Sequence, residues 1–172
     1  MVNDITESGM DFVSENTFQI EKSAAYKNSG KGIRSVEFVR VKEDKLLFVE
    51  AKTKFPNPNP DPNNPSEENG EEKLKRFQSE INNICDKFIH SLNLFSSVKV
   101  GVTEDTFPDD FVLPDRVSLV FVLVVKNHEL NYCKPIKQKL MEILPSYLKK
   151  IWKPEVYVIN HKTATKQELT KI

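Results

Sequence analysis

The sequence predicts an α/β fold in which helices flank a central mixed β-sheet. Two β-rich runs, 35–41 and 46–52, are separated by only four polar residues, which is typical of a hairpin. Apolar residues recur every three or four positions over 71–95, the spacing of an amphipathic helix. The run 116–125 is almost continuously β-branched and apolar, as in strands buried on both faces of a sheet. Strands and helices in this order favour one domain, 1–172.

The first predicted strand covers 17–23, where apolar and polar residues alternate. The hairpin strands follow, and after them the composition changes abruptly over 55–70, which holds five of the ten prolines. Proline lacks a backbone donor and keeps the preceding residue extended, so this segment is neither a helix nor a central strand. We expect a Pro/Asn-rich loop inserted within the single domain.

The second half of the chain alternates helices and strands. After the helix over 71–95, residues 98–102 predict a short strand and 116–125 a buried one. A second amphipathic helix is predicted from Pro135 to Ile151, with the proline in the first turn. The last strand is predicted over 155–161.

Composition excludes several classes of protein. The 172 residues carry 25 basic and 25 acidic side chains, so the chain does not coat nucleic acid by bulk charge. The longest largely apolar run, Val117–Val125, is much shorter than the ~20 residues of a membrane span, so we expect no membrane partner. The N-terminus lacks a basic patch followed by an apolar stretch, and we expect no secretory signal. Two isolated cysteines, Cys85 and Cys133, favour a cytoplasmic location and give no zinc-ligand spacing.

The hairpin brings ionisable residues together on an apolar background. If Glu43 and Asp44 form a two-residue turn, Glu37 lies directly opposite Glu50. Because side chains alternate along a strand, Glu37, Glu50 and Lys52 then project from the same face. Two facing carboxylates destabilise a hydrophobic hairpin unless a cation lies between them. An oxygen-seeking divalent ion such as Mg²⁺ suits this position.

An acid on one strand, a hairpin, then Glu50-Ala51-Lys52 on the next strand and a helix after it resembles the PD-(D/E)xK nuclease superfamily. The resemblance covers roughly residues 17–95 and implies a restriction-endonuclease-like sandwich. It implies that Glu37 and Glu50 bind Mg²⁺, or Mn²⁺ in its place, with help from the Ala51 carbonyl. Lys52 would then position or activate the attacking water.

The same resemblance assigns supporting roles to residues outside the hairpin. Glu21, on the preceding predicted strand, corresponds to an extra metal-binding acid of some members, and Gln78 to a helix glutamine of exonuclease-like members. Lys27, Lys31 and Arg34 lie where they would contact a phosphate backbone. The implied activity is metal-dependent endo- or exonuclease cleavage of nucleic acid, DNA in preference to RNA. At zero net charge, a homodimer or a partner protein would supply additional affinity.

Two other interpretations remain open. The first acid is Glu where the superfamily pattern has Asp, and Val36 stands where it has proline. A catalytically inactive relative that serves as a protein- or nucleic-acid-binding module has the same residues. An unrelated sandwich, with Glu37 and Lys52 as an ordinary cross-strand ion pair, is the third interpretation.

Overall fold

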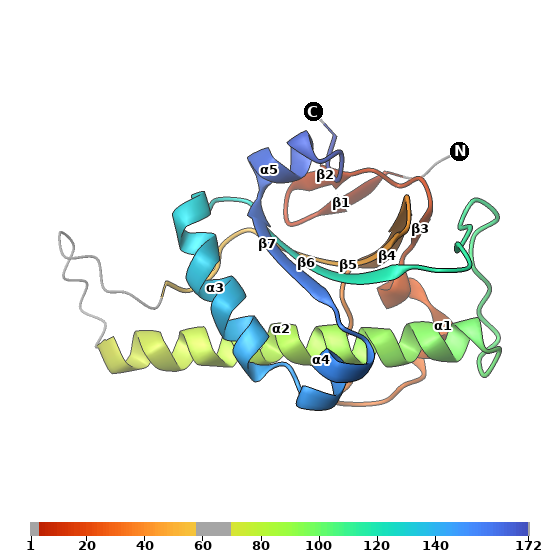
Figure 1. Cartoon of the computed structure of the whole chain (residues 1–172), viewed down its shortest axis with the longest axis horizontal. Coiled ribbons are helices and arrows are strands. Elements are labelled where there is room, and N and C mark those ends of the chain that lie inside the picture. The colour runs from red at the N-terminus through yellow and green to blue at the C-terminus, as the bar shows by residue number, and fades with distance from the viewer. Residues whose placement is uncertain (1–3, 58–69, 172) are drawn as a thin grey trace.

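The computed structural model describes residues 4–57 and 70–171 and contains a central five-stranded mixed sheet (Figure 1). Its strands, in the order in which they lie side by side, are β3 (Thr17–Phe18), β4 (Phe38–Lys42), β5 (Lys45–Lys52), β6 (Ser118–Val125) and β7 (Glu155–Asn160). The pairs β3–β4 and β4–β5 are antiparallel, whereas β5–β6 and β6–β7 are parallel. The predicted α/β class with a mixed sheet and flanking helices is confirmed.

Helices and a second hairpin cover the two faces of this sheet (Figure 1). The lower layer of the view holds α2 (Gly70–Lys99), α3 (Leu130–Ile143), α4 (Ser146–Ile151), the short α1 (Ala24–Lys27) and the 3-10 helix η1 (Ile20–Lys22). The upper layer holds the hairpin of β1 (Ile5–Glu7) and β2 (Met10–Phe12), together with α5 (His161–Lys166). The sheet therefore has two buried faces, each with its own apolar cluster.

The register of the β4–β5 hairpin is the predicted one. Lys42 pairs with Lys45 and Phe38 with Val49, and the amide of Glu37 donates to the Val49 carbonyl at 3.1 Å. Alternation then sends Phe38 and Val49 into the upper cluster. Glu50, which has the same parity as Phe48 on β5, faces the helical layer, since Phe48 belongs to the lower cluster.

Helix α2 is longer than predicted. Its buried apolar stripe continues as far as Val98, so the helix extends from Gly70 to Lys99. The predicted strand over 98–102 is therefore wrong. The chain leaves the helix through a turn in which Gly101 has a φ of 74°, a conformation that suits glycine. The helix then crosses over to β6, which places the C-terminal ends of β5 and β6 at the same edge of the sheet.

The predicted strand over 17–23 is also only partly correct. Extended backbone ends at Phe18, and η1 and α1 follow at once. Ser23 explains the change, because its side chain accepts a hydrogen bond from the amide of Tyr26 and caps α1. Glu21 consequently lies on a 3-10 helix rather than on a strand.

The predicted helix from Pro135 to Ile151 is two helices. The first begins earlier, at Leu130, with Pro135 inside it. It ends at Ile143, and the next residue, Leu144, has an extended ψ of 131°, because the residue before Pro145 avoids the helical region. The last strand ends at Asn160, whose side chain accepts from the Thr163 amide and caps α5.

Most of the predicted loop over 55–70 lies outside the described residues. At its start, Phe55 is buried edge-on against Phe77 of α2, with ring centroids 6.0 Å apart. Among the helices of the described ranges, none is long and apolar enough to cross a membrane.

Candidate metal centre

Glu50 is the most deeply buried charged side chain of the candidate site. It lies near the end of β5 on the helical face, and none of its side-chain surface is exposed. Lys87 of α2 donates to its Oε1 at 2.6 Å, and the Lys52 Nζ lies 4.0 Å from the same atom. Its Oε2 has no hydrogen-bond partner in the described part of the chain. Burial raises the pKa of Glu50, and Lys87 and Lys52 oppose that shift.

Glu37 directly precedes β4, just beyond the last pair of the hairpin register, Phe38–Val49, and it is half-buried. Burial is the largest influence on it, followed by the negative charges of Glu50 and Glu21, and together they raise the pKa of Glu37 to about 8. A carboxyl group with this pKa mostly holds a proton at neutral pH. When no cation is present, Glu37 is therefore mostly neutral, which reduces its charge repulsion with Glu50.

Three carboxyl groups converge at this point from three separate elements. Glu7 of β1, Glu21 of η1 and Glu37 each offer an oxygen, and these oxygens all lie within 4.8 Å of one another. Glu7 and Glu37 are hydrogen-bonded, and burial followed by the charge of Glu21 raises the pKa of Glu7. Glu50 lies close enough to act on Glu37 as its strongest charged neighbour.

The β1–β2 turn is tied to the end of the sheet, which fixes the position of Glu7. The Ser8 hydroxyl donates to the Ala51 carbonyl at 3.0 Å, and the Thr53 hydroxyl donates to the Ser8 carbonyl at 3.3 Å. Lys126, just after β6, donates to the Gly9 carbonyl at 2.6 Å. The Ala51 carbonyl, an expected metal ligand, therefore faces the turn that carries Glu7.

Lys52 is held between two carboxylates at the rim of the site. Its Nζ lies 3.5 Å from the Glu80 Oε2 and 4.0 Å from the Glu50 Oε1, and 26% of its side chain is exposed. The structure pairs Lys52 with these acids rather than with Glu37, so the cross-strand pair of the third interpretation is not formed. Asn83 donates to Glu80 at 3.5 Å and accepts from the Arg34 guanidinium at 2.5 Å.

One polar stripe of α2 supplies these contacts. Glu80, Asn83, Lys87 and Ser91 recur every three or four residues, so they share a helix face. Ser91 is fully buried and accepts from the Val36 amide at 2.8 Å, which anchors the chain just before Glu37. Sequence reasoning missed Lys87. The sequence did contain a signal, because this polar stripe lies beside the apolar one. A lysine in it contacts side chains of the sheet against which the helix packs.

The structure thus brings together Glu21, Glu37, Glu50, Ala51 and Lys52, and adds Glu7 and Lys87, which were not expected. Gln78 lies elsewhere, because nine residues at about 100° each place it on the opposite side of α2 from Lys87. Its amide donates to Asn82 instead. Lys27 and Lys31 are exposed, and their side chains make no hydrogen bond to these site residues in the described ranges. Arg34 reaches the site indirectly, through Asn83.

Comparisons with protein-family models, with curated proteins and with solved structures give no match.

The chemistry of the site follows from its donor atoms. Carboxylate oxygens, with a backbone carbonyl nearby, are the ligands of hard divalent cations such as Mg²⁺ and Mn²⁺. Burial is the main cause of the raised pKa values of Glu7 and Glu37, and the charges of neighbouring acids, Glu21 for Glu7 and Glu50 and Glu21 for Glu37, add to it. The buried, unpartnered Oε2 of Glu50 adds an acceptor whose desolvation is uncompensated. These residues fit a cation.

Proposed function

We propose that this protein is a restriction-endonuclease-like nuclease that uses Mg²⁺, or Mn²⁺, to hydrolyse phosphodiester bonds of nucleic acid. The observation that carries the proposal is the convergence of Glu7, Glu21 and Glu37 within 4.8 Å, beside the buried Glu50. The order of elements also supports it. An antiparallel hairpin, a crossover helix and a strand parallel to β5 put the acids and Lys52 at one edge of a mixed sheet.

Each side chain has a role that its surroundings support. Glu7, Glu21 and Glu37 would hold the cation, with Glu50 completing the negative charge around it. A bound Mg²⁺ supplies a Lewis acid that neutralises charge developing on the phosphate and lowers the pKa of water. Lys52, partly exposed between Glu50 and Glu80, would direct its ammonium group toward the water or the phosphate. Lys87 offsets the charge of Glu50 from below the sheet.

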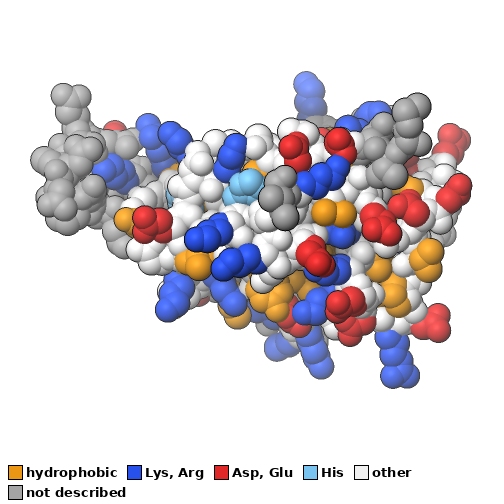
Figure 2. All heavy atoms as spheres, turned by 90° about the horizontal axis from the view of Figure 1, so that it is seen from above, with side chains coloured by type: hydrophobic (Ala, Val, Ile, Leu, Met, Phe, Trp, Pro, Cys, Tyr) orange, Lys and Arg blue, Asp and Glu red, His pale blue; other side chains and the backbone are white. Residues whose placement is uncertain are grey.

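Charge distribution supports a polyanionic substrate in spite of the zero net charge. On the face that carries α5, basic side chains lie across the middle of the view and acidic ones gather toward its right-hand end (Figure 2). A nucleic acid, DNA in preference to RNA, would follow the basic region and avoid the acidic end. Arg34, Lys27 and Lys31 would add phosphate contacts beside the site. We also propose a homodimer or a partner protein, and a cytoplasmic setting in keeping with the free, buried Cys85 and Cys133.

One observation favours a second candidate function, a catalytically inactive module that binds nucleic acid or protein. Lys87 already supplies Glu50 with a counter-charge at 2.6 Å, as a structural ion pair would. In that case the hairpin acids serve only the fold. Partner binding would then survive removal of Lys52, whereas a nuclease would lose activity.

The test combines calorimetry with cleavage. Mg²⁺ and Mn²⁺ are titrated into the wild type, Glu37→Gln and Lys52→Met, and each protein is incubated with single-stranded DNA, duplex DNA and RNA. We expect Glu37→Gln to lose metal binding, and Lys52→Met to bind metal but cleave at least about 100-fold more slowly.

Glu142→Gln is the matched control, because Glu142 is exposed and, among the described residues, its carboxylate pairs with Lys139 of α3 alone. It should bind metal and cleave as the wild type does. Absence of metal binding by the wild type, or full cleavage by Lys52→Met, would contradict the proposal.

A further inference from the structure

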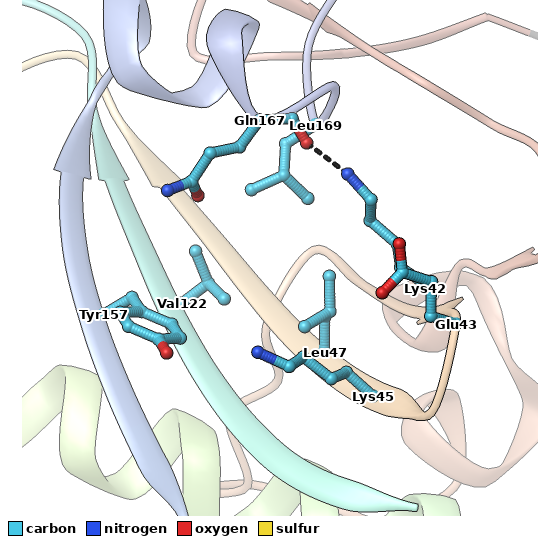
Figure 3. A pocket seen from close by; sticks show the side chains of 8 residues that line it. All are labelled: Lys42, Glu43, Lys45, Leu47, Val122, Tyr157, Gln167 and Leu169. Carbon is cyan, nitrogen blue, oxygen red and sulfur yellow. Dashed lines mark hydrogen bonds between the residues drawn. The ribbon is translucent and has the colours of Figure 1, made fainter.

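A pocket of about 310 Å³ lies on the sheet face opposite α2, at the beginning of β5 (Figure 3). It is lined by Lys42, Glu43, Lys45, Leu47, Val122, Tyr157, Gln167 and Leu169. Five residues of extended strand separate Lys45 from Glu50, or about 17 Å. The pocket is therefore distinct from the candidate metal centre in both position and sheet face.

The pocket combines an apolar floor with one aromatic ring. Leu47, Val122 and Leu169 form the floor, and Tyr157 of β7 stands beside it (Figure 3). The Tyr157 hydroxyl donates to the carboxylate of Glu155, which fixes the ring. Such a surface takes up a flat, apolar ring system, since ring contacts and burial of the floor both favour it.

Two polar groups of the pocket have no hydrogen-bond partner in the described ranges, although Lys45, like Lys137, lies over the Tyr157 ring. The Lys45 Nζ lies 5.9 Å from the centroid of the Tyr157 ring and has no carboxylate partner in the described ranges. The Gln167 side-chain amide likewise has no hydrogen-bond partner there, and it points over the floor toward the Tyr157 side (Figure 3). An ammonium group and a primary amide therefore converge on an apolar floor.

The remaining charged residues of the lining are Lys42 and Glu43. Lys42 donates to the Gln167 carbonyl at 2.5 Å and pairs with Glu168 at 3.4 Å, which ties the hairpin to the end of α5. Glu43 is the one acid of the lining. Because Lys42 is paired with Glu168, Lys45 is the cation of the lining that has no carboxylate partner in the described ranges, and it would pair with an anion.

We propose that this pocket binds a nucleoside monophosphate unit. The base would lie on the apolar floor beside Tyr157, with its donor and acceptor edge on the Gln167 amide, which can both donate and accept. The phosphate would pair with the Lys45 ammonium. A volume of about 310 Å³ suits one nucleotide and is small for two. The unit has two sources, a free mononucleotide or the phosphorylated end of a strand, and the inference does not depend on the nuclease proposal.

The experiment is calorimetry in EDTA, so that the metal centre does not contribute. The wild type is titrated with AMP, GMP, CMP and UMP, with adenosine and ribose 5-phosphate as half-ligands, and with a short 5′-phosphorylated oligonucleotide. We expect at least one mononucleotide to bind, and each half-ligand to bind at least about tenfold more weakly. If the oligonucleotide binds only when its terminal phosphate is present, the pocket also accepts the phosphorylated end of a strand.

Variants then locate the binding site. Lys45→Met and Gln167→Ala should each weaken the mononucleotide about tenfold, and Gln167 is exposed at the end of α5, so its loss leaves the fold intact. Lys139→Met, at a partly exposed lysine of α3 outside this pocket, should bind as the wild type does, and so should Glu37→Gln. The proposal is overturned if neither mononucleotides nor the oligonucleotide bind the wild type at about millimolar concentration, or if Lys45→Met and Gln167→Ala bind unchanged.

Discussion

Glu50 depends on Lys87 for its counter-charge. No part of the Glu50 side chain reaches solvent, and the Lys87 side chain is itself only 19% exposed. Burying such a pair gains little over apolar residues, but removing one partner leaves the other charge desolvated and alone. A single substitution that removes either partner should therefore destabilise the fold strongly.

We predict that Lys87→Met lowers the free energy of unfolding by about 3–5 kcal/mol, because it leaves Glu50 buried without its closest cation. The double variant Glu50→Gln/Lys87→Met should recover most of this loss. Urea unfolding of the two single variants and the double variant measures the coupling. Lys75→Met, which removes an exposed pair with Glu71, should change stability by less than about 0.5 kcal/mol. Equal losses in Lys75→Met and Lys87→Met would refute the prediction.

Glu37 makes stability depend on pH. Its pKa rises from 4.5 to about 8 on folding, chiefly through burial and the charges of Glu50 and Glu21. Between these values the folded protein holds a proton that the unfolded chain has released, so stability is highest below the window and falls as pH rises through it. In metal-free buffer we expect the free energy of unfolding to decrease from about pH 5 to about pH 8.

Glu37→Gln should flatten this profile, since the amide does not titrate. Glu142→Gln, at an exposed position, should keep the wild-type slope. Urea unfolding at several pH values distinguishes them, and an unchanged slope in Glu37→Gln would assign the dependence to other groups.

Strand parity was enough to predict the hairpin register from Lys42–Lys45 to Phe38–Val49 and the shared face of Glu50 and Lys52, because a two-residue turn fixes the later pairs. Glu37 lies just outside this register, and its charge interaction with Glu50 shows that the two are neighbours. Strand parity does not predict which side chains of other helices and strands contact that face. Glu7 reaches the site from a hairpin that pairs with no strand of the main sheet, and Lys87 from a helix whose rotation depends on packing. These long-range contacts are set by tertiary structure, which local sequence patterns do not encode.

The β1–β2 hairpin positions Glu7 through its turn. Ser8 and Gly9 both have positive φ, 52° and 71°, and the turn is bonded to Ala51, Thr53 and Lys126. A Cβ on Gly9 would lie 2.9 Å from the Lys126 Nζ, which donates to the Gly9 carbonyl. A side chain at this position would displace the end of the flexible Lys126 side chain from the Gly9 carbonyl, and its φ of 71° is strained for any residue but glycine.

We predict that Gly9→Ala costs about 1–2 kcal/mol of stability, because alanine is strained at this φ. It should also weaken Mg²⁺ binding several-fold, because loss of the Lys126 hydrogen bond loosens the turn that carries Glu7. Gly101→Ala is the matched control. Gly101 has a similar φ of 74°, and a Cβ there meets nothing within 4 Å. It should lose comparable stability but bind Mg²⁺ normally. Calorimetric titration and urea unfolding of both variants give the comparison, and a parallel loss of metal affinity in Gly101→Ala would contradict it.

Elements with a long regular pattern were predictable, and short or interrupted ones were not. The apolar stripe of α2 and the buried run of β6 hold over many residues. By contrast, the segment from Ile20 to Lys27 becomes helical because Ser23 caps it, and the helix near Pro145 divides because of a single residue. In such places a single capping hydrogen bond or a single proline ring determines the backbone conformation, and the hydrophobic pattern of the surrounding residues does not predict it.

The candidate metal centre exists only when the whole molecule is assembled. Glu7 belongs to the layer above the sheet, and Glu21 and Lys87 to the layer below it, while Glu37 and Glu50 come from the hairpin between them (Figure 1). Unfolding either layer separates the donors. A cation that binds this arrangement must therefore stabilise the entire fold, by an amount that grows with its concentration.

This linkage predicts that Mg²⁺ removes the pH dependence. Without metal, raising the pH from about 5 to about 8 destabilises the protein, because Glu37 loses a proton that only the folded state retained. With saturating Mg²⁺ Glu37 is deprotonated in the folded and in the unfolded state alike, so the gain in metal affinity with pH offsets that loss and Tm should be nearly constant over the range. Thermal unfolding at both pH values, with Mg²⁺ and with EDTA, measures the four Tm values. In Glu37→Gln the effect of Mg²⁺ should be small and nearly independent of pH. If Mg²⁺ shifts the Tm of the wild type and of Glu37→Gln equally, the ion binds elsewhere, and the acids at this edge serve only the fold.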